Sequence, residues 1–471
     1  MADNVTITQG TGVTTTVAAE DIGGVMFQQV KLAVGTAGST SVVPADATYG
    51  LGVDVKRITG PFTLDPDTAM SDAFGRLRVS LPITLFDSTF VYGKNEYQYE
   101  YVTAGTGTAS HSAQYASVIM TATATNDSCT IQSRPYIPYT PGKSQMVVMT
   151  FNGTAIQTNV TKEIGYGDDN DGIFLQLVDT DAYAKFVIRN YGSETESVAQ
   201  DSPWNIDPMN GTGPSGIDLD WTKIQILVID LQWLGAGRVR VGFDIDGLVY
   251  WAHEFKHANS FSSVYMRTAA LPVRWKITNT LGTALGQLVA ICATAFSEGG
   301  GDESHGYTFA ANSTLAGIAS SATARAILSI RPAGTLQGVV NRVEINPNSL
   351  GLSLSSTGLS TVLATLVYDA TFTTAPTYTA VNSTHSAAEF TQHAEGGQFT
   401  GGIVLWSSFI GVSASGAAVD RSALEHEIVQ RLPMTLNVAG VSTSGKSLSL
   451  VVQTASGNGT LWGTMHWTEV R

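Results

Sequence analysis

The segment 217–255, IDLDWTKIQILVIDLQWLGAGRVRVGFDIDGLVYWAHEF, constrains the fold of this chain more than any other segment. Residues 223–233 are apolar on both alternating faces, which predicts a strand covered on both sides within a packed sheet. Residues 238–245 alternate strictly between apolar and polar side chains, which predicts a strand with one face on a core. On this strand, the side chains expected to point outward are Arg238, Arg240 and Asp244.

Asp246 and Gly247 connect this strand to the next one. This residue pair is favoured in a two-residue type I′ hairpin, because both turn positions require a positive φ. Residues 248–255 then return as a third strand. The segment therefore predicts three consecutive antiparallel strands.

The composition favours an all-β chain. Charged residues make up only 14% of the 471 residues, and glycine occurs 48 times, whereas amphipathic helices need charged outer faces. Turn signals recur at intervals of about ten residues between positions 115 and 274, which predicts a sandwich or jelly roll rather than βαβ units. The only candidates for helices are short, namely parts of residues 281–296, and residues 421–431.

Three sections can be distinguished along the chain. Residues 1–70 are polar and rich in Gly and Thr, with short strand-like pieces at 5–8 and 25–34. We expect this section to dock on another domain, subunit or assembly, and the alternative is a partly ordered tail. Residues 71–300 are predicted to form a concanavalin-like or jelly-roll sandwich, and residues 301–471 a second β-sandwich.

The charge and the cysteines exclude several classes of protein. The formal net charge of −14 argues against nucleic-acid binding, because an acidic surface repels phosphate. The amino terminus lacks the basic and apolar regions of a secretory signal, and no apolar run is long enough to span a bilayer. Two cysteines are too few for a disulfide framework, so we interpret Cys129 and Cys292 as buried free thiols.

His253-Glu254-Phe255-Lys256-His257 matches the H-E-x-x-H signature of zinc proteases. That chemistry needs a helix, on which residues four apart share one face. Here the motif ends a predicted strand, where residues four apart are separated by roughly 13 Å. We therefore interpret the match as accidental and predict no metal at this motif.

Gly211, Gly213 and Gly216 match the G-x-G-x-x-G pattern of dinucleotide sites. Such a site requires a strand before the glycines and a helix after them. In this chain Pro214 interrupts the pattern and a predicted strand follows it, which indicates a tight loop. The sequence contains no P-loop and no G-x-S-x-G nucleophile elbow, and it predicts no cofactor.

The acidic segment GDDNDG at 167–172 is a candidate for binding calcium or glycan. It does not fit an EF-hand, because Gly167 and Val178 occupy two of the ligand positions. Clustered loop carboxylates between strands could still hold Ca²⁺, and the alternative is a plain acidic turn. The candidate residues are Asp168, Asp169, Asn170 and Asp171.

Five of the eight tryptophans fall within the first predicted sandwich. Exposed tryptophans could stack on sugar rings, but in a sandwich of this size we favour a place in the core. Carboxylate pairs for glycoside cleavage are set by spacing in three dimensions, and no pair stands out from the sequence. The five residues are Trp204, Trp221, Trp233, Trp251 and Trp275.

The block WNIDPMNGTGPSGIDLDWTKIQILVIDLQWLGAGRVRVGFDIDG at 204–247 resembles a widespread family of virion structural proteins of tailed bacteriophages. The flanking pieces SDAFGRLRVS, GYGDDNDGIFLQL and ARAILSIRP agree with this likeness. DIGGVMFQQVKLAVG, near the start, looks like an N-terminal segment common on phage fibre and head proteins. The likeness covers most of the chain from about Ser71.

The resemblance implies a concanavalin-like sandwich followed by further β-structure, and no catalytic residues carry over from it. We therefore expect a non-enzymatic protein of the virion exterior, either a head decoration or head fibre, or a tail fibre or spike. Its partners would be other virion proteins of the capsid or tail, reached through the N-terminal section as a docking arm. We expect assembly in the host cytoplasm, without membrane insertion, and a homo-oligomer, with a trimer favoured.

A host-glycan-binding adhesin is the alternative function, and a polysaccharide depolymerase is the less favoured second one. An adhesin would show a groove with exposed Trp and loop carboxylates. A depolymerase would need two acidic side chains that face each other across a cleft.

Overall fold

The structure is a computed structural model in which the chain forms two compact units, Met1–Thr63 and Leu64–Arg471. In the first unit it describes six short strands. In the second unit it describes residues 82–178, 184–200, 204–282, 285–299, 306–356, 358–412, 417–423 and 446–470. The described residues contain no helix, and so none that is long and apolar enough to cross a membrane.

The strands of the first unit form three antiparallel pairs. They are β1 (Val5–Thr8) with β2 (Thr14–Val17), β3 (Ala19–Ile22) with β4 (Val25–Gln28), and β5 (Ala45–Asp46) with β6 (Gly50–Leu51). The strand predicted at 5–8 coincides with β1, and the piece predicted at 25–34 begins with β4. Docking by this section stays a prediction.

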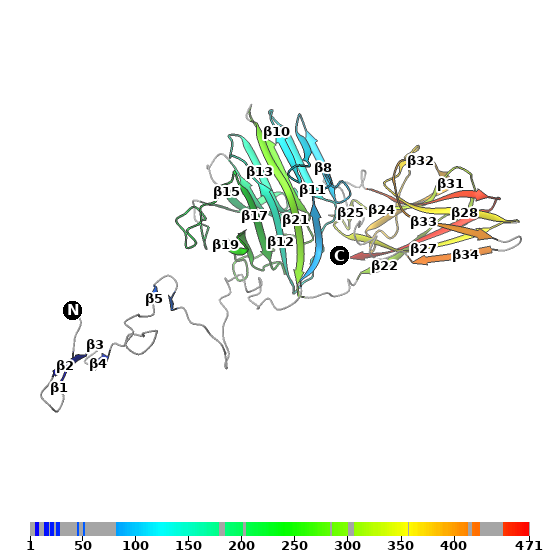
Figure 1. The fold of residues 1–471 in the computed structure, drawn as a ribbon. Coiled ribbons are helices and arrows are strands. Elements are labelled where there is room, and N and C mark those ends of the chain that lie inside the picture. The colour runs from blue at the N-terminus through cyan, green and yellow to red at the C-terminus, as the bar shows by residue number, and fades with distance from the viewer. Residues whose placement is uncertain are drawn as a thin grey trace. The chain divides into compact units, whose positions relative to one another are not determined.

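The first sandwich of the second unit consists of an eight-stranded and a seven-stranded antiparallel sheet (Figure 1). The eight-stranded sheet has the order β19-β18-β17-β12-β21-β10-β9, with β7 beside β21. Its strands are β7 (Ile83–Thr89), β9 (Thr108–Ser112), β10 (Ser117–Ala122), β12 (Ser144–Asn152), β17 (Ile224–Leu231), β18 (Val239–Ile245), β19 (Leu248–Phe255) and β21 (Gly286–Glu298).

The seven-stranded sheet has the order β16-β15-β14-β13-β20-β11-β8. Its strands are β8 (Tyr99–Ala104), β11 (Ser128–Ser133), β13 (Val160–Gly167), β14 (Gly172–Leu177), β15 (Ala184–Asn190), β16 (Ser193–Ala199) and β20 (Val273–Asn279). One apolar core takes side chains from both sheets, for example Val147 and Leu227 from one and Ile164 and Leu175 from the other. The predicted all-β sandwich is confirmed.

The predicted three-stranded meander is also confirmed. Strands β17, β18 and β19 are consecutive neighbours, and Ile245 pairs with Leu248 across a two-residue turn. Asp246 and Gly247 have φ values of 55° and 83°, which the type I′ turn requires. The register therefore follows from the turn.

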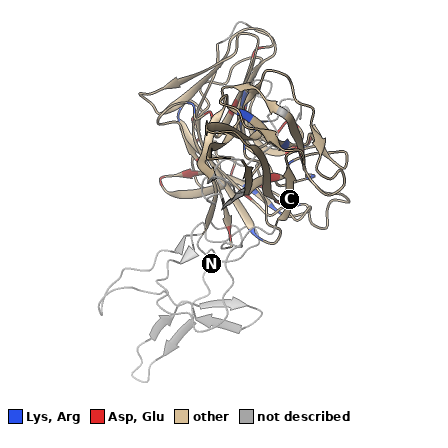
Figure 2. Ribbon diagram, turned by 90° about the vertical axis from the view of Figure 1, so that its right-hand side faces the viewer, with Lys and Arg blue, Asp and Glu red and all other residues tan. Residues whose placement is uncertain are grey.

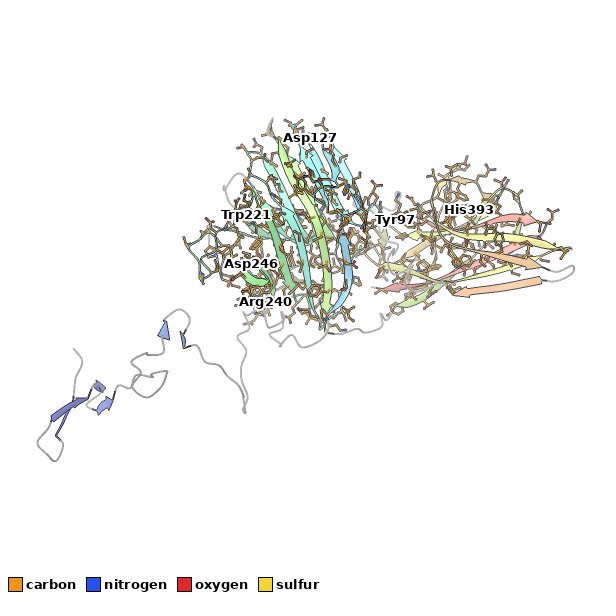
Figure 3. The ribbon with its side chains drawn as sticks, viewed as in Figure 1. Tyr97, Asp127, Trp221, Arg240, Asp246 and His393 are labelled. Atoms are coloured by element: carbon orange, nitrogen blue, oxygen red, sulfur yellow. The ribbon has the colours of Figure 1, made fainter. Side chains whose placement is uncertain are left out.

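The burial of Arg240 in β18 differs from the prediction (Figure 3). It lies on the outer face of the sheet, as expected, but its side chain is completely buried. Its Nη2 lies 2.5 Å from Oδ2 of Asp230, which is equally buried, and its guanidinium lies 4.5 Å from the ring centre of Trp251. A charge at this depth needs such partners, because an unpaired charge would cost several kcal/mol.

The second sandwich pairs a five-stranded sheet, β22-β36-β27-β34 with β23 beside β36, with a six-stranded sheet, β30-β31-β24-β35-β28-β33. These strands enclose a second apolar core. The five-stranded sheet contains β22 (Tyr307–Asn312), β23 (Ile318–Ala319), β27 (Glu344–Ser355), β34 (Ala417–Ala423) and β36 (Thr460–Val470). The six-stranded sheet contains β24 (Arg325–Pro332), β28 (Ser360–Tyr368), β30 (Thr379–Ala380), β31 (Ala388–Gly397), β33 (Ile403–Val412) and β35 (Leu448–Ser456).

The helix predicted at 281–296 is wrong. This region contains β21, thirteen residues that lie between β12 and β10 in the eight-stranded sheet. Its side chains alternate between buried and half-buried positions, and the sheet overrides the weak helix preference of its alanines. Of the second helix candidate, residues 421–423 belong to β34 and the remainder lies outside the described residues.

Both cysteines are free. Cys129 is buried as predicted, and burial raises the pKa of its thiol to about 12. Cys292 is only half-buried, and its Sγ lies 3.2 Å from Oγ1 of Thr150. The prediction of a buried thiol is therefore correct for Cys129 and wrong for Cys292.

Lys162 of β13 is a cation with no exposed surface. Its Nζ donates hydrogen bonds to the carbonyl oxygens of Gly153 and Ala155, at 2.6 and 2.7 Å, and to Oγ1 of Thr154 at 2.9 Å. These neutral acceptors satisfy the donors but only partly replace water, and burial lowers the lysine pKa to about 8.

This pKa predicts a stability that depends on pH. Above about pH 8 the folded chain releases the Lys162 proton, whereas an unfolded lysine keeps it until about pH 10.5, so the free energy of unfolding should rise with pH in this window. Urea titrations at pH 7 and pH 9 should show a rise of about 1 kcal/mol in the wild type relative to Lys162→Met. An equal pH dependence in both proteins would contradict the assignment.

Candidate functional site

A groove of about 470 Å³ lies on the outer face of the seven-stranded sheet. It is built by the strand register, which places Lys276, Glu163, Gln176 and Lys185 side by side in one row across β20, β13, β14 and β15. The next row, Trp275, Ile164, Leu175 and Phe186, points the other way into the core. The alternation of the strands therefore gives one apolar face and one polar face.

The polar side chains in this groove are connected to one another. Nη2 of Arg189 lies 2.6 Å from Oε2 of Glu163. Nε2 of Gln176 donates to Glu163 at 3.0 Å and to Glu194 at 2.8 Å, and Lys185 donates to Glu194 at 3.2 Å. Burial opposes ionisation of Glu194, but the hydrogen bonds from Gln176 and Lys185 outweigh it and lower the pKa of this carboxyl. Glu194 is thus held as an anion.

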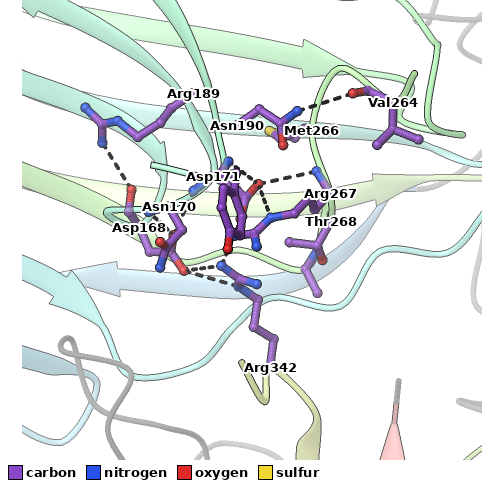
Figure 4. A network of polar contacts seen from close by, with 12 residues as sticks. Asp168, Asn170, Asp171, Arg189, Asn190, Val264, Met266, Arg267, Thr268 and Arg342 are labelled. Carbon is purple, nitrogen blue, oxygen red and sulfur yellow. Dashed lines mark hydrogen bonds and ion pairs between the residues drawn. The ribbon is translucent and has the colours of Figure 1, made fainter. Parts of the chain in front are cut away.

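The acidic segment predicted as a calcium or glycan site is the hairpin loop between β13 and β14 (Figure 4). Oδ1 of Asp168 accepts the backbone N–H groups of Asn170 and Asp171, at 2.7 and 2.9 Å, which closes the turn. Its Oδ2 accepts Nε and Nη2 of Arg342, at 3.2 and 2.9 Å. Nη2 of Arg342 also lies 3.0 Å from Oδ2 of Asp171, which is in turn bound by Arg267 at 2.7 Å.

Arg342 precedes β27 in the second sandwich, so we call its contacts with Asp168 and Asp171 the junction. All three side chains are almost completely buried. The contact with Asp168 uses two nitrogens of one guanidinium, which is a strong and directional form of ion pair. The junction therefore ties the second sandwich to a hairpin of the first.

Asp169 and Asn170 have other partners. Oδ1 of Asp169 lies 2.8 Å from Nη1 of Arg274 and 3.0 Å from Nζ of Lys276. Partial burial opposes its ionisation, but these two cations lower the pKa of Asp169 well below its usual value. Asn170 contributes its backbone carbonyl, which accepts the N–H of Gly192 at 2.8 Å.

The carboxylates of this loop are therefore occupied by the chain's own cations, which favours the acidic-turn alternative. Within the described parts of the chain, no group of three or more His, Cys, Asp or Glu side chains is arranged to hold a metal ion. Lys276 lines the groove and contacts Asp169, and Arg189 joins Glu163 to the backbone oxygen of Asp168. Loop and groove thus form one continuous polar region.

The H-E-x-x-H motif lies at the end of strand β19, as predicted, and its two histidines have different partners. Nδ1 of His253 accepts the N–H of Asn205 at 3.1 Å, whereas His257 contacts the Gly237 carbonyl oxygen at 2.6 Å and Glu196 at 2.7 Å. The ring of Phe255 contacts both imidazoles, at centroid distances of 4.4 and 6.5 Å. Burial lowers the pKa of His253 to about 4, so this imidazole is neutral at pH 7.

The three glycines of the G-x-G-x-x-G match lie in a loop before β17, as predicted. Gly213 is required there, because a Cβ at this position would lie 2.0 Å from Oδ1 of Asp207. Oδ2 of the same aspartate accepts the N–H of Ser215 at 2.8 Å. The glycine allows the loop to close on Asp207.

Four of the five tryptophans of the first sandwich pack in or against its core, as predicted, and Trp251 lies in a smaller buried cluster with Met146 and Val228. Trp204, Trp251 and Trp275 are buried, and Trp221 and Trp233 are half-buried against the core. None of them lines the groove. The groove on this sheet therefore lacks the exposed Trp that was expected of an adhesin.

The sequence reasoning missed the groove residues, because strands β13 and β16 were not predicted. The segment VTKEIGYG of β13 contains two charged residues side by side, one of which is the buried Lys162, and this obscures the alternation. The signal that was present is the mixture of Glu, Lys and Arg at alternate positions of β15 and β16. Only the register shows that these charges meet.

No family model and no curated protein matches this chain. The chain is similar to solved structures, three of which are described next. A glycosyl hydrolase family protein from Mycobacterium fortuitum is 9% identical over 45% of this chain and 99% of its own, with a TM-score of 0.33. The potassium-bound carbohydrate recognition domain of Emp46p is 8% identical over 45% and 95%, with a TM-score of 0.29. Peanut lectin with a 9mer peptide is 11% identical over 46% and 98%, with a TM-score of 0.29.

Likenesses at these TM-scores carry no functional argument. The assignment of a β-sandwich rests on the strand pairing of the chain itself.

The junction predicts that Arg342→Met destabilises the protein. The substitution leaves the buried carboxylate of Asp168 without its cation, so we expect the free energy of unfolding to fall by about 2 kcal/mol or more in urea titrations. The matched control is Lys256→Met, which removes a mostly exposed cation paired with Glu254 and should cost less than about 1 kcal/mol. Equal losses in the two variants would show that the junction adds no stability.

Proposed function

We propose that this chain is a non-enzymatic structural protein of a bacteriophage virion, placed on the outside of the head or the tail. In this proposal residues 1–70 dock on a capsid or tail protein, and the two sandwiches face outward. The resemblance of residues 204–247 and their flanking pieces to phage virion proteins supports the assignment. The net charge of −14 would keep free copies soluble before assembly.

The observation that carries the proposal is the junction. A particle component must keep the arrangement of its domains through assembly, and a buried two-nitrogen ion pair resists separation because it would leave an uncompensated charge behind. Arginines of the same chain form ion pairs with three acidic side chains, Asp168, Asp171 and Glu163. Acidic groups that are paired in this way stabilise the fold and are not free to take part in a reaction.

Particles provide the direct test. Immunogold labelling of purified virions with an antibody against the sandwiches should place label on the head or tail surface. A chain lacking residues 1–70, supplied during infection in place of the full chain, should stay soluble and be absent from particles by mass spectrometry. The proposal is wrong if virions contain none of the full-length protein, or if the shortened chain is incorporated equally well.

A second candidate function is the binding of host glycan in the groove. The observation that favours it is the row of Glu163, Gln176, Lys185 and Lys276, which presents carboxylate, amide and ammonium groups along an open sheet face. Such groups can exchange hydrogen bonds with sugar hydroxyls. A depolymerase is less well supported, because its general acid needs a raised pKa and that of Glu194 is lowered.

A glycan array tests this second function. If the groove binds sugar, the full chain should bind defined host glycans, and Glu194→Ala should reduce the signal at least about tenfold by removing an acceptor and freeing Gln176 and Lys185. The matched control is Glu96→Ala, an exposed glutamate outside the groove. A blank array for the wild type, or equal binding by both variants, would exclude glycan recognition by the groove.

A further inference from the structure

Strand β33, Ile403–Val412, lies at an edge of the six-stranded sheet. One side of the strand pairs with β28, and among the described residues no strand pairs with the other side. Natural edge strands are usually protected by charged side chains, proline, β-bulges or short length. Of these, β33 has a bulge, where its register with β28 shifts between Leu366 and Val367. The ten residues of β33, IVLWSSFIGV, contain neither charge nor proline.

The outer face of this edge exposes apolar side chains. Val404 is 59% exposed and Phe409 is 65% exposed. In the register with β28 they lie opposite Val367 and Leu363, so apolar positions continue inward from the edge. A contact at the edge could therefore bury apolar area as well as pair backbone groups.

Charges are sparse around β33, with Asp369 and Lys446 beside Ile403 at its start. Residues 396–419 contain no Asp, Glu, Lys or Arg, and neither do the neighbouring strands β28 and β35. Charged positions are sparse along the described ribbon as a whole (Figure 2). Two copies of a chain with a net charge of −14 repel each other, so an uncharged face is where they can meet at least electrostatic cost.

We propose that β33 is a self-association edge, at which β33 of one copy pairs antiparallel with β33 of a second copy of this chain. The same surface is used by both copies, as two-fold symmetry requires. Pairing a strand with itself normally risks placing like charges opposite each other, and the sequence of β33 avoids this. The contact forms a dimer. It does not depend on the assignment to a virion.

Sedimentation or light scattering of the full chain at increasing concentration tests the proposal. We expect a concentration-dependent dimer, and the double variant Val404→Lys, Phe409→Lys should raise its dissociation constant at least about tenfold, because four lysines would then meet at one edge. The matched control is Leu315→Lys, which adds the same charge to a residue of the second sandwich that is 90% exposed and lies outside β33. The control should dimerise like the wild type.

A cross-linking variant tests the geometry separately. Ser407 is exposed and lies near the middle of β33, so antiparallel self-pairing brings the two copies of this residue close together. Under mild oxidation Ser407→Cys should give a reducible covalent dimer, and Leu315→Cys should not. Circular dichroism of every variant should match the wild type, because the replaced side chains are exposed.

Three outcomes would overturn the proposal. One is a full chain that stays monomeric at all concentrations. Another is a dimer whose dissociation constant does not respond to the lysines in β33, because its contact must then lie elsewhere. The third is slow hydrogen exchange of the β33 amides that does not change with concentration, which would mean that the edge is already covered within one copy of the chain.

Discussion

The ion pairs of Arg342 with Asp168 and Asp171 connect a residue before β27 to the loop between β13 and β14. The same loop depends on Asp168 for its shape, since one carboxylate oxygen closes the turn through two backbone N–H groups and the other receives the arginine. One side chain thus serves both the hairpin and the contact between the sandwiches. Because a carboxylate buried at this depth cannot lose its cation without a large cost, the junction holds this hairpin loop, whose Asp168 carbonyl oxygen also accepts a hydrogen bond from Arg189.

The charged groups of the groove are also paired with other groups of the same chain. Glu163 is neutralised by Arg189, and Glu194 is held by Gln176 and Lys185, so a ligand would have to compete with contacts that already exist. An enzyme of the glycosidase type keeps one carboxyl group protonated by isolating it from cations. In this groove, by contrast, the carboxyl group of Glu194 contacts the cation of Lys185. The lowered pKa of Glu194 makes this carboxyl group a poor general acid.

The parts of the fold that could be predicted are those whose signal is local. The turn at Asp246 and Gly247 sets the register of β18 and β19 by itself, so the meander could be derived from the sequence alone. Strand β21 was mistaken for a helix because its small residues carry little strand preference, and its position between β12 and β10 decides its structure. The groove could not be predicted, because its row of side chains comes from four strands that meet only through their register.

The two sandwiches use their surfaces differently. The first places Lys, Arg and Glu side by side on a sheet face, where water or a polar ligand can solvate them. The second presents long uncharged strands, including an edge strand with exposed Val404 and Phe409. A solvated charged face resists protein contact because the charges would have to lose water, whereas an uncharged edge loses little on pairing. The proposed contact between copies therefore lies on the second sandwich, and the proposed glycan-binding groove on the first.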